Sequence, residues 1–151
     1  MKETIWPRLR CAAGLFCVGG GLYNIIEICW RGYTHWSMFV VGGLCFPIIG
    51  WIHTHLKKMH LINRCFLCSV AITAIEFISG CVVNLWLKMN VWDYSYLPMN
   101  LLGQICLIYS VLWGLLSIVA IPIYKYLCRL FGGASQKKPV IPSVIHDKQA
   151  S

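Results

Sequence analysis

Four long apolar segments constrain this chain more than any other feature of its sequence. They cover residues 11–30, 36–52, 65–87 and 104–127. A helix needs about 20 mostly apolar residues to cross the hydrocarbon core of a bilayer. None of the segments shows the period-two alternation that is typical of a membrane strand. The sequence therefore predicts an all-α integral membrane protein with four spanning helices.

The composition supports this environment. Only 12% of the residues are charged, whereas an ordinary soluble domain has about 25%. This excludes a soluble globular enzyme, and it argues against a nucleic-acid partner even though the net charge is +8. The bilayer itself is the first expected partner. The chain also lacks the Walker A pattern, so it is not a P-loop ATPase.

The basic residues predict the orientation. Of the 13 Lys and Arg residues, all but Arg31 and Lys88 lie in the N-terminal tail, the middle loop or the C-terminal end. Cytoplasmic loops carry such an excess. We therefore expect both termini to be cytoplasmic in a plasma-membrane protein, with the spans arranged as two antiparallel hairpins. The expected parts are an N-tail (1–10), a membrane domain (11–127) and a flexible basic tail (128–151).

Three acids lie outside the two tails. Glu27 and Glu76 fall within predicted spans, and Asp93 falls in an outer loop. A charged acid at mid-bilayer costs about 2.5–3.5 kcal/mol, so such residues face the bundle interior and often mark function. Helical spacing puts Glu27 and Arg31 on one face, and Glu76 and Asn84 on another. These faces predict a polar seam that opens outward.

The outer loops add polar groups to this seam. The candidate substrate-binding residues are Glu27, Arg31, His35, Glu76, Asn84, Asp93, Asn100 and Gln104. The alternative is structural: Glu27 and Arg31 form an ion pair at i, i+4, Asp93 caps a turn, and the Trp and Tyr residues near the span ends form an interfacial belt.

Neither a metal nor another cofactor is expected. The middle loop carries three histidines and a Cys-x-x-Cys pair, but their spacing fits no standard zinc pattern. Cys29, Cys81 and Cys106 fall at similar outer depths. A disulfide among them stays open, because sequence does not test the required geometry.

Several motifs occur in an order that resembles a known family. From about residue 14 to residue 116 the chain carries WRGYTHWSM after an acid, then EFISG, and then VWDYS. In these motifs it is similar to the bacterial CmpB-type proteins described as putative ABC-transporter type IV. The resemblance implies a permease-like subunit for a small polar or charged solute. It also implies a separate ATP-binding subunit, and four short spans suggest a homo-oligomer.

Two other classes of function stay open from the residues. One is a non-catalytic membrane scaffold or regulator in which the polar seam fixes helix packing. The other is a membrane-embedded enzyme that acts on a lipid headgroup, with Glu76 or Asp93 as base and His35 or Arg31 stabilising charge. Whether the chain is an enzyme stays open at this point, although it carries no ATPase motif.

Overall fold

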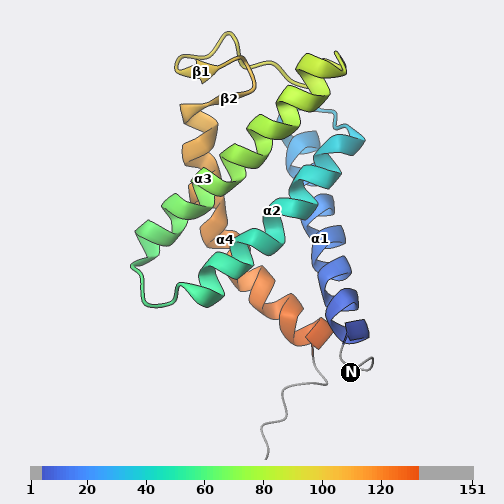
Figure 1. The fold of residues 1–151 in the computed structure, drawn as a ribbon, viewed down its shortest axis with the longest axis vertical. Helices are drawn as coiled ribbons and strands as arrows, with labels where there is room; N and C mark the ends of the chain where they lie inside the picture. Colours follow the sequence, from blue (N-terminus) through green and yellow to red (C-terminus); the bar gives the residue numbers. More distant parts are fainter. Residues whose placement is uncertain (1–4, 133–151) are drawn as a thin grey trace, which may run out of the picture.

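The computed structural model describes residues 5–132, and its architecture is helical (Figure 1). A small two-stranded antiparallel hairpin is inserted before the last helix. The elements are α1 (Ile5–Arg31), α2 (Trp36–His55), α3 (Leu61–Gly80), the π-helix η1 (Cys81–Trp86), β1 (Asn100–Leu101), β2 (Ile105–Cys106) and α4 (Leu107–Gly132).

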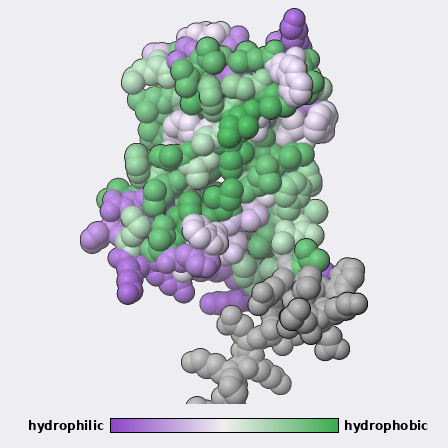
Figure 2. Space-filling view, viewed as in Figure 1, coloured by the Kyte–Doolittle hydropathy of each residue, from purple (hydrophilic) through white to green (hydrophobic). Residues whose placement is uncertain are grey.

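Within residues 5–132, four helical segments are long and apolar enough to cross a membrane. Figure 2 shows a green hydrophobic band across the middle of the molecule, with hydrophilic purple groups gathered toward both ends. This distribution is typical of a protein whose outer surface faces lipid. The prediction of a multi-pass helical membrane protein is confirmed.

The observed helix ends differ from the predicted segment ends. Helix α1 begins at Ile5, so much of the expected N-tail is helical, and α4 continues to Gly132. The last helix begins at Leu107 rather than Gln104, because the β-hairpin occupies the preceding residues. The proposed flexible tail from residue 133 onward lies outside the described residues.

The chain reverses direction at each connection between the long helices (Figure 1). The most extensive contacts join α1 with α2, and α3 with α4. The arrangement as two membrane hairpins with cytoplasmic termini stays a prediction.

Close approach of two backbones joins α1 to α2. A Cβ atom added at Gly42 would lie 2.3 Å from the Cβ atom of Tyr23 and 2.8 Å from the carbonyl oxygen of Gly19. Small residues at such positions let membrane helices pack closely. The glycine at position 42 therefore fixes Tyr23 against α2, and Tyr23 is one of the residues that build the candidate site.

Small polar side chains join α3 to α4. The Thr73 hydroxyl donates to the Ser110 hydroxyl at 2.9 Å, and Ser69 donates to the Ser110 backbone carbonyl. Hydrogen bonds of this kind between helices are common in membrane bundles. They hold the start of α4 beside α3. The loop of residues 87–99, between η1 and β1, lies at the same end of the molecule, and we call it the outer loop.

Candidate functional site

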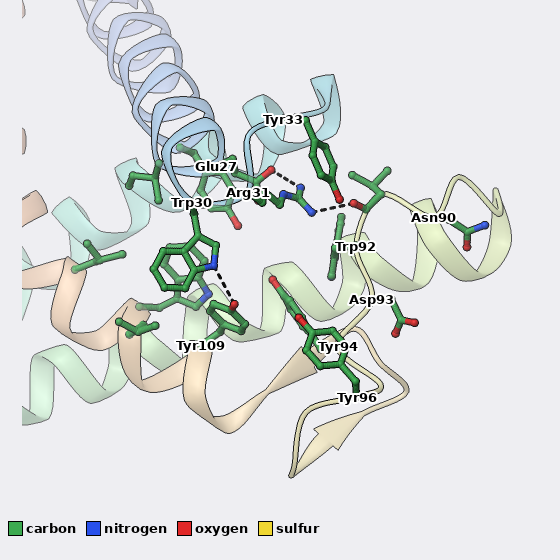
Figure 3. Close-up of a pocket in the computed structure, with 16 residues that line it drawn as sticks. Glu27, Trp30, Arg31, Tyr33, Asn90, Trp92, Asp93, Tyr94, Tyr96 and Tyr109 are labelled. Atoms are coloured by element: carbon green, nitrogen blue, oxygen red, sulfur yellow. Dashed lines mark hydrogen bonds and ion pairs between the residues drawn. The ribbon is translucent and has the colours of Figure 1, made fainter.

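A pocket of about 600 Å³ lies where α1 ends and α4 begins. We call it the outer pocket. Its walls come from the end of α1, the α1–α2 connection, the segment after η1 and the first turns of α4 (Figure 3). The lining residues are Tyr23, Ile26, Glu27, Trp30, Arg31, Tyr33, Asn90, Val91, Trp92, Asp93, Tyr94, Tyr96, Tyr109, Leu112, Trp113 and Leu116.

Glu27 and Arg31 form an ion pair at the edge of the outer pocket. The Arg31 Nη2 atom donates to Glu27 Oε2, and Arg31 Nη1 donates to the Val91 carbonyl at 2.9 Å. The guanidinium carbon also lies 4.7 Å from the ring centroid of Tyr33, in a cation–π contact. Arg31 thus ties α1 to the outer loop (Figure 3).

Aromatic side chains from α1, the outer loop and α4 contact one another across the pocket. The Trp30 indole N–H donates to the Tyr109 hydroxyl at 3.1 Å, and the rings of Tyr94 and Tyr109 stack with centroids 4.7 Å apart. Burial raises the pKa of Tyr94 above its ordinary value, so this phenol stays neutral at physiological pH.

Glu76 lies behind the pocket wall rather than on its surface. Its side chain is buried, with 4% of the residue exposed. The Tyr23 hydroxyl donates to Glu76 Oε1 at 2.8 Å, and the Trp113 indole N–H donates to Glu76 Oε2 at 2.7 Å. Both donors are neutral, and among residues 5–132 no basic side chain forms an ion pair with this carboxylate. Three helices therefore meet at one buried carboxylate.

A second cavity of about 250 Å³ adjoins the outer pocket. We call it the inner cavity. Four residues, Tyr23, Ile26, Trp113 and Leu116, line both spaces. The rest of its lining is apolar apart from glycine and comes from all four long helices. The stacked rings of Tyr23 and Trp113 therefore stand at the boundary between a polar outer space and an apolar inner one.

Asn84 holds the outer loop in place. Its Nδ2 atom donates to the Trp92 carbonyl at 3.0 Å and to Gln104 Oε1 at 2.8 Å, and its Oδ1 atom accepts from the Val91 backbone N–H at 2.7 Å. The residue sits in the π-helical turn η1, a type of distortion that is frequent at functional sites. These partners belong to the loop and to the turn of the β-hairpin, so Asn84 positions the pocket wall without lining it.

Asn100 and Gln104 complete this internal network. Asn100 donates to the Leu97 carbonyl at 2.7 Å and accepts from the Gly103 backbone N–H at 3.1 Å, while the Gln104 carbonyl accepts from the Trp92 indole at 2.9 Å. The network supports a loop in which Lys88, Asn90, Met99 and Leu102 adopt positive φ angles. Such conformations are costly for lysine, methionine and leucine, less so for asparagine, and need support from their surroundings.

Asp93 lies on the rim of the outer pocket and binds its own loop. Its Oδ1 atom accepts the Ser95 backbone N–H, and its Oδ2 atom accepts the Ser95 hydroxyl, each at 2.8 Å. These hydrogen bonds hold the pKa of the Asp93 carboxyl below its ordinary value. In Figure 3 the carboxylate points away from Glu27 and Arg31. Asp93 therefore contributes its charge to the rim rather than a direct contact with the ion pair.

His35 has a local role at the start of α2. It is the N-cap of this helix, and its Nδ1 atom lies 3.3 Å from the Ser37 backbone N–H and 2.9 Å from the Ser37 hydroxyl. It does not line the outer pocket.

The structure brings three of the predicted residues to one cavity. Glu27, Arg31 and Asp93 line the outer pocket. Four of the others lie behind its wall or support it, namely Glu76, Asn84, Asn100 and Gln104, whereas His35 caps α2. The sequence reasoning missed the aromatic lining, because it assigned the aromatic residues at the span ends to an interfacial belt.

The structure describes all nine cysteines and the histidines of the middle loop. All nine cysteines are free thiols, and Cys29, Cys81 and Cys106 are exposed, half-buried and buried respectively. Within residues 5–132, no group of three or more His, Cys, Asp or Glu side chains is placed to hold a metal ion.

The comparisons with known proteins agree with the motifs. A sequence model of the family described as "Putative ABC-transporter type IV" matches residues 15–144. This match includes α1 from Leu15 onward, the whole outer pocket and the remaining helices. No solved structure matches the fold.

Proposed function

Because this chain belongs to the putative ABC-transporter type IV family, we propose that it is the membrane-embedded permease subunit of a transporter. Its solute is small and polar or charged, and the outer pocket is where that solute first binds. The chain is a multi-pass membrane protein, and ATP hydrolysis would come from a separate subunit, since the sequence has no Walker A pattern.

One observation carries this proposal: the outer pocket and the inner cavity share the residues at their boundary. The aromatic pair Tyr23 and Trp113 stands between them, and both rings are anchored to Glu76. A solute that enters the outer pocket therefore has a second space ahead of it, toward the middle of the helices. An intramembrane acid beside such a route is a functional-site hypothesis by default, which supports the proposal.

The distribution of basic residues supports an orientation of this route across the membrane. Of the basic residues within 5–132, Arg31 and Lys88 lie at the end of the molecule that holds the outer pocket, and the others lie toward the opposite end. By the positive-inside rule the outer pocket faces away from the cytoplasm of the plasma membrane. The proposed site residues are Glu27, Arg31 and Asp93, with Glu76 at the boundary.

A scaffold is the second candidate, and one observation favours it. The Glu76 carboxylate joins α1, α3 and α4 through its two hydrogen bonds, which is also what a purely structural polar residue would do. An enzyme is less well supported, because no histidine lines the outer pocket.

Purification from native membranes separates these candidates. The full chain, extracted in mild detergent after brief cross-linking, should bring with it a subunit that carries a Walker A motif, and the complex should hydrolyse ATP. A homo-oligomer that is repeatedly isolated without any ATP-binding subunit would contradict the permease proposal and favour the scaffold.

A further inference from the structure

Electron-rich aromatic rings dominate the outer pocket. Eight of its 16 lining residues are Tyr or Trp and none is Phe, although the chain contains 6 Phe residues. The faces of Trp and Tyr rings attract cations, and recognition of quaternary ammonium groups by several such rings is the best-known functional use of this attraction. The lining therefore indicates more than a general apolar surface.

The charged groups of the pocket favour a cation as well. Its charged side chains are Glu27, Arg31 and Asp93, and neither a lysine nor a histidine lines it. Glu27 and Arg31 neutralise each other, so the carboxylate of Asp93 leaves one net negative charge. Among residues 5–132, both hydrogen bonds to Glu27 reach its Oε2 atom, which leaves Oε1 as an acceptor.

The pocket offers few free hydrogen-bond donors to an anionic ligand. Both terminal nitrogen atoms of Arg31 already donate, one to Glu27 and one to the Val91 carbonyl, and its guanidinium lies over Tyr33. Only the Nε atom of Arg31 is without a partner within the described residues. The pocket thus already holds one cation, that of Arg31, against an aromatic face.

From the lining, the charge and the engaged arginine we infer that the outer pocket binds an organic cation of the quaternary or tertiary ammonium class. This inference deepens the proposed function and rests on it. Such a cation is weakly hydrated, so its transfer into the pocket costs little, and its alkyl groups can contact Ile26, Leu112 and Leu116 between the aromatic faces. The cation is either a free solute or the headgroup of a lipid.

Direct binding tests the class of ligand. The full chain is placed in nanodiscs of phosphatidylglycerol, a lipid without an ammonium group, and titrated with tetramethylammonium and choline by calorimetry. We expect saturable binding of both. The uncharged isostere of choline, in which carbon replaces the quaternary nitrogen, should bind at least about tenfold more weakly. Equal binding of the isostere, or binding of inorganic phosphate alone, would overturn the inference.

Two exposed tryptophans provide a matched pair of variants. Trp30 lines the outer pocket and is 71% exposed, whereas Trp86 is 77% exposed at the end of η1 and lies outside it. Trp30→Leu should weaken tetramethylammonium binding by roughly 2- to 30-fold, the range for one cation–π contact. Trp86→Leu should leave binding unchanged, and equal losses in both variants would contradict the assigned site.

A second aromatic variant covers the case in which Trp30→Leu does not fold. Tyr96 also lines the pocket, comes from the outer loop and is 75% exposed. Its replacement by leucine leaves the helices intact, and we expect a loss of affinity in the same range. Wild-type affinity in the folded Tyr96→Leu and Trp30→Leu proteins would overturn the inference.

Two further experiments distinguish a lipid headgroup from a free solute as the ligand, and the binding of an ammonium group from its transport. If a lipid headgroup occupies the pocket, tetramethylammonium affinity falls as phosphatidylcholine replaces uncharged diacylglycerol at a constant phosphatidylglycerol content; if the ligand is a free solute, affinity stays constant. Uptake of labelled choline into proteoliposomes with the ATP-binding subunit tests transport. Binding of choline without uptake would contradict transport of this ligand and would still support the ammonium site. Uptake of another solute, without binding of an ammonium cation, would overturn the ammonium site and leave the permease proposal in place.

Discussion

The ring of Tyr23 on α1 stacks on the ring of Trp113 on α4, with centroids 5.2 Å apart and an interplanar angle of 27°. The polar atoms of both rings reach Glu76 on α3. One carboxylate therefore sets the positions of the two rings that separate the outer pocket from the inner cavity. This arrangement gives specific expectations for substitutions at each of its parts.

Replacement of Glu76 by glutamine should separate function from folding. The amide replaces one of the two carboxylate oxygens by an NH2 donor, so either Tyr23 or Trp113 loses the acceptor that it faces, while the size of the side chain is kept. We expect folded protein near the wild-type level and a loss of uptake of about tenfold or more, equal to roughly 1.4 kcal/mol. Uptake into proteoliposomes and size-exclusion profiles measure the two effects. Loss of the folded protein would instead favour the scaffold.

Tyr23→Phe should destabilise the helical bundle. It removes the hydroxyl that donates to Glu76 Oε1 at 2.8 Å and leaves the ring in place. A hydrogen bond contributes about 0.5–1.5 kcal/mol to a neutral group and about 1.5–3 kcal/mol to a charged one, so thermal unfolding in detergent should begin at a lower temperature. Tyr126→Phe is the control, because Tyr126 is exposed on α4. Equal unfolding temperatures for the two variants would count against the carboxylate as a junction of three helices.

Gly42→Ala should disturb the same junction from the side of α2. The new Cβ atom would lie 2.3 Å from the Tyr23 Cβ atom, so the helices must separate, at a cost of about 1–3 kcal/mol. Gly21 lies nearby on α1, and a Cβ atom added there meets no atom within 4 Å. Gly21→Ala should therefore be neutral or stabilising by up to about 1 kcal/mol. Denaturant unfolding of both variants checks the contrast, and a tolerated Gly42→Ala would refute the close approach.

The Asp93 carboxylate should stabilise the outer loop down to acidic pH. Its folded pKa lies below the ordinary value of 3.8, because the backbone N–H and the hydroxyl of Ser95 donate to it. The stabilisation is therefore fully present above pH 3.8 and is lost only as the pH falls through the folded pKa. The stability difference between wild type and Asp93→Asn should stay constant from pH 7 to about pH 5. A difference that vanishes within that interval would contradict the Asp93–Ser95 contact.

Much of the fold could be predicted from the sequence. The four helices follow from runs of apolar residues long enough for a bilayer, and the ion pair of Glu27 and Arg31 follows from their i, i+4 spacing. The start of the last helix was different: the apolar pattern predicts it at Gln104, whereas α4 begins at Leu107. At Gln104 the backbone carbonyl accepts from the Trp92 indole, and this contact depends on the tertiary structure of the loop.

The candidate site was predictable only in part, for a physical reason. An acid within an apolar segment is unusual, so the sequence alone indicates Glu27 and Glu76 as candidate site residues. It does not indicate their aromatic partners, because tyrosine and tryptophan near span ends are common at any membrane interface. Only the crossing of α1 and α4 places Tyr23 and Trp113 on the same carboxylate. The sequence also grouped Glu76 with Asp93, whereas the structure puts one behind the pocket wall and the other on its rim.

Thiol accessibility tests the proposed route most directly, without knowledge of the solute. Leu116→Cys places a thiol at the boundary of the two cavities, whereas Leu115→Cys places one on the lipid-facing surface of the same helix, at a residue that is 57% exposed. A small membrane-impermeant thiol reagent is applied from outside, and modification is read by site-resolved mass spectrometry. We predict rapid modification at position 116 and little at position 115. Protection at position 116, or faster modification at position 115, would contradict an outer pocket that leads water and solute into the helices.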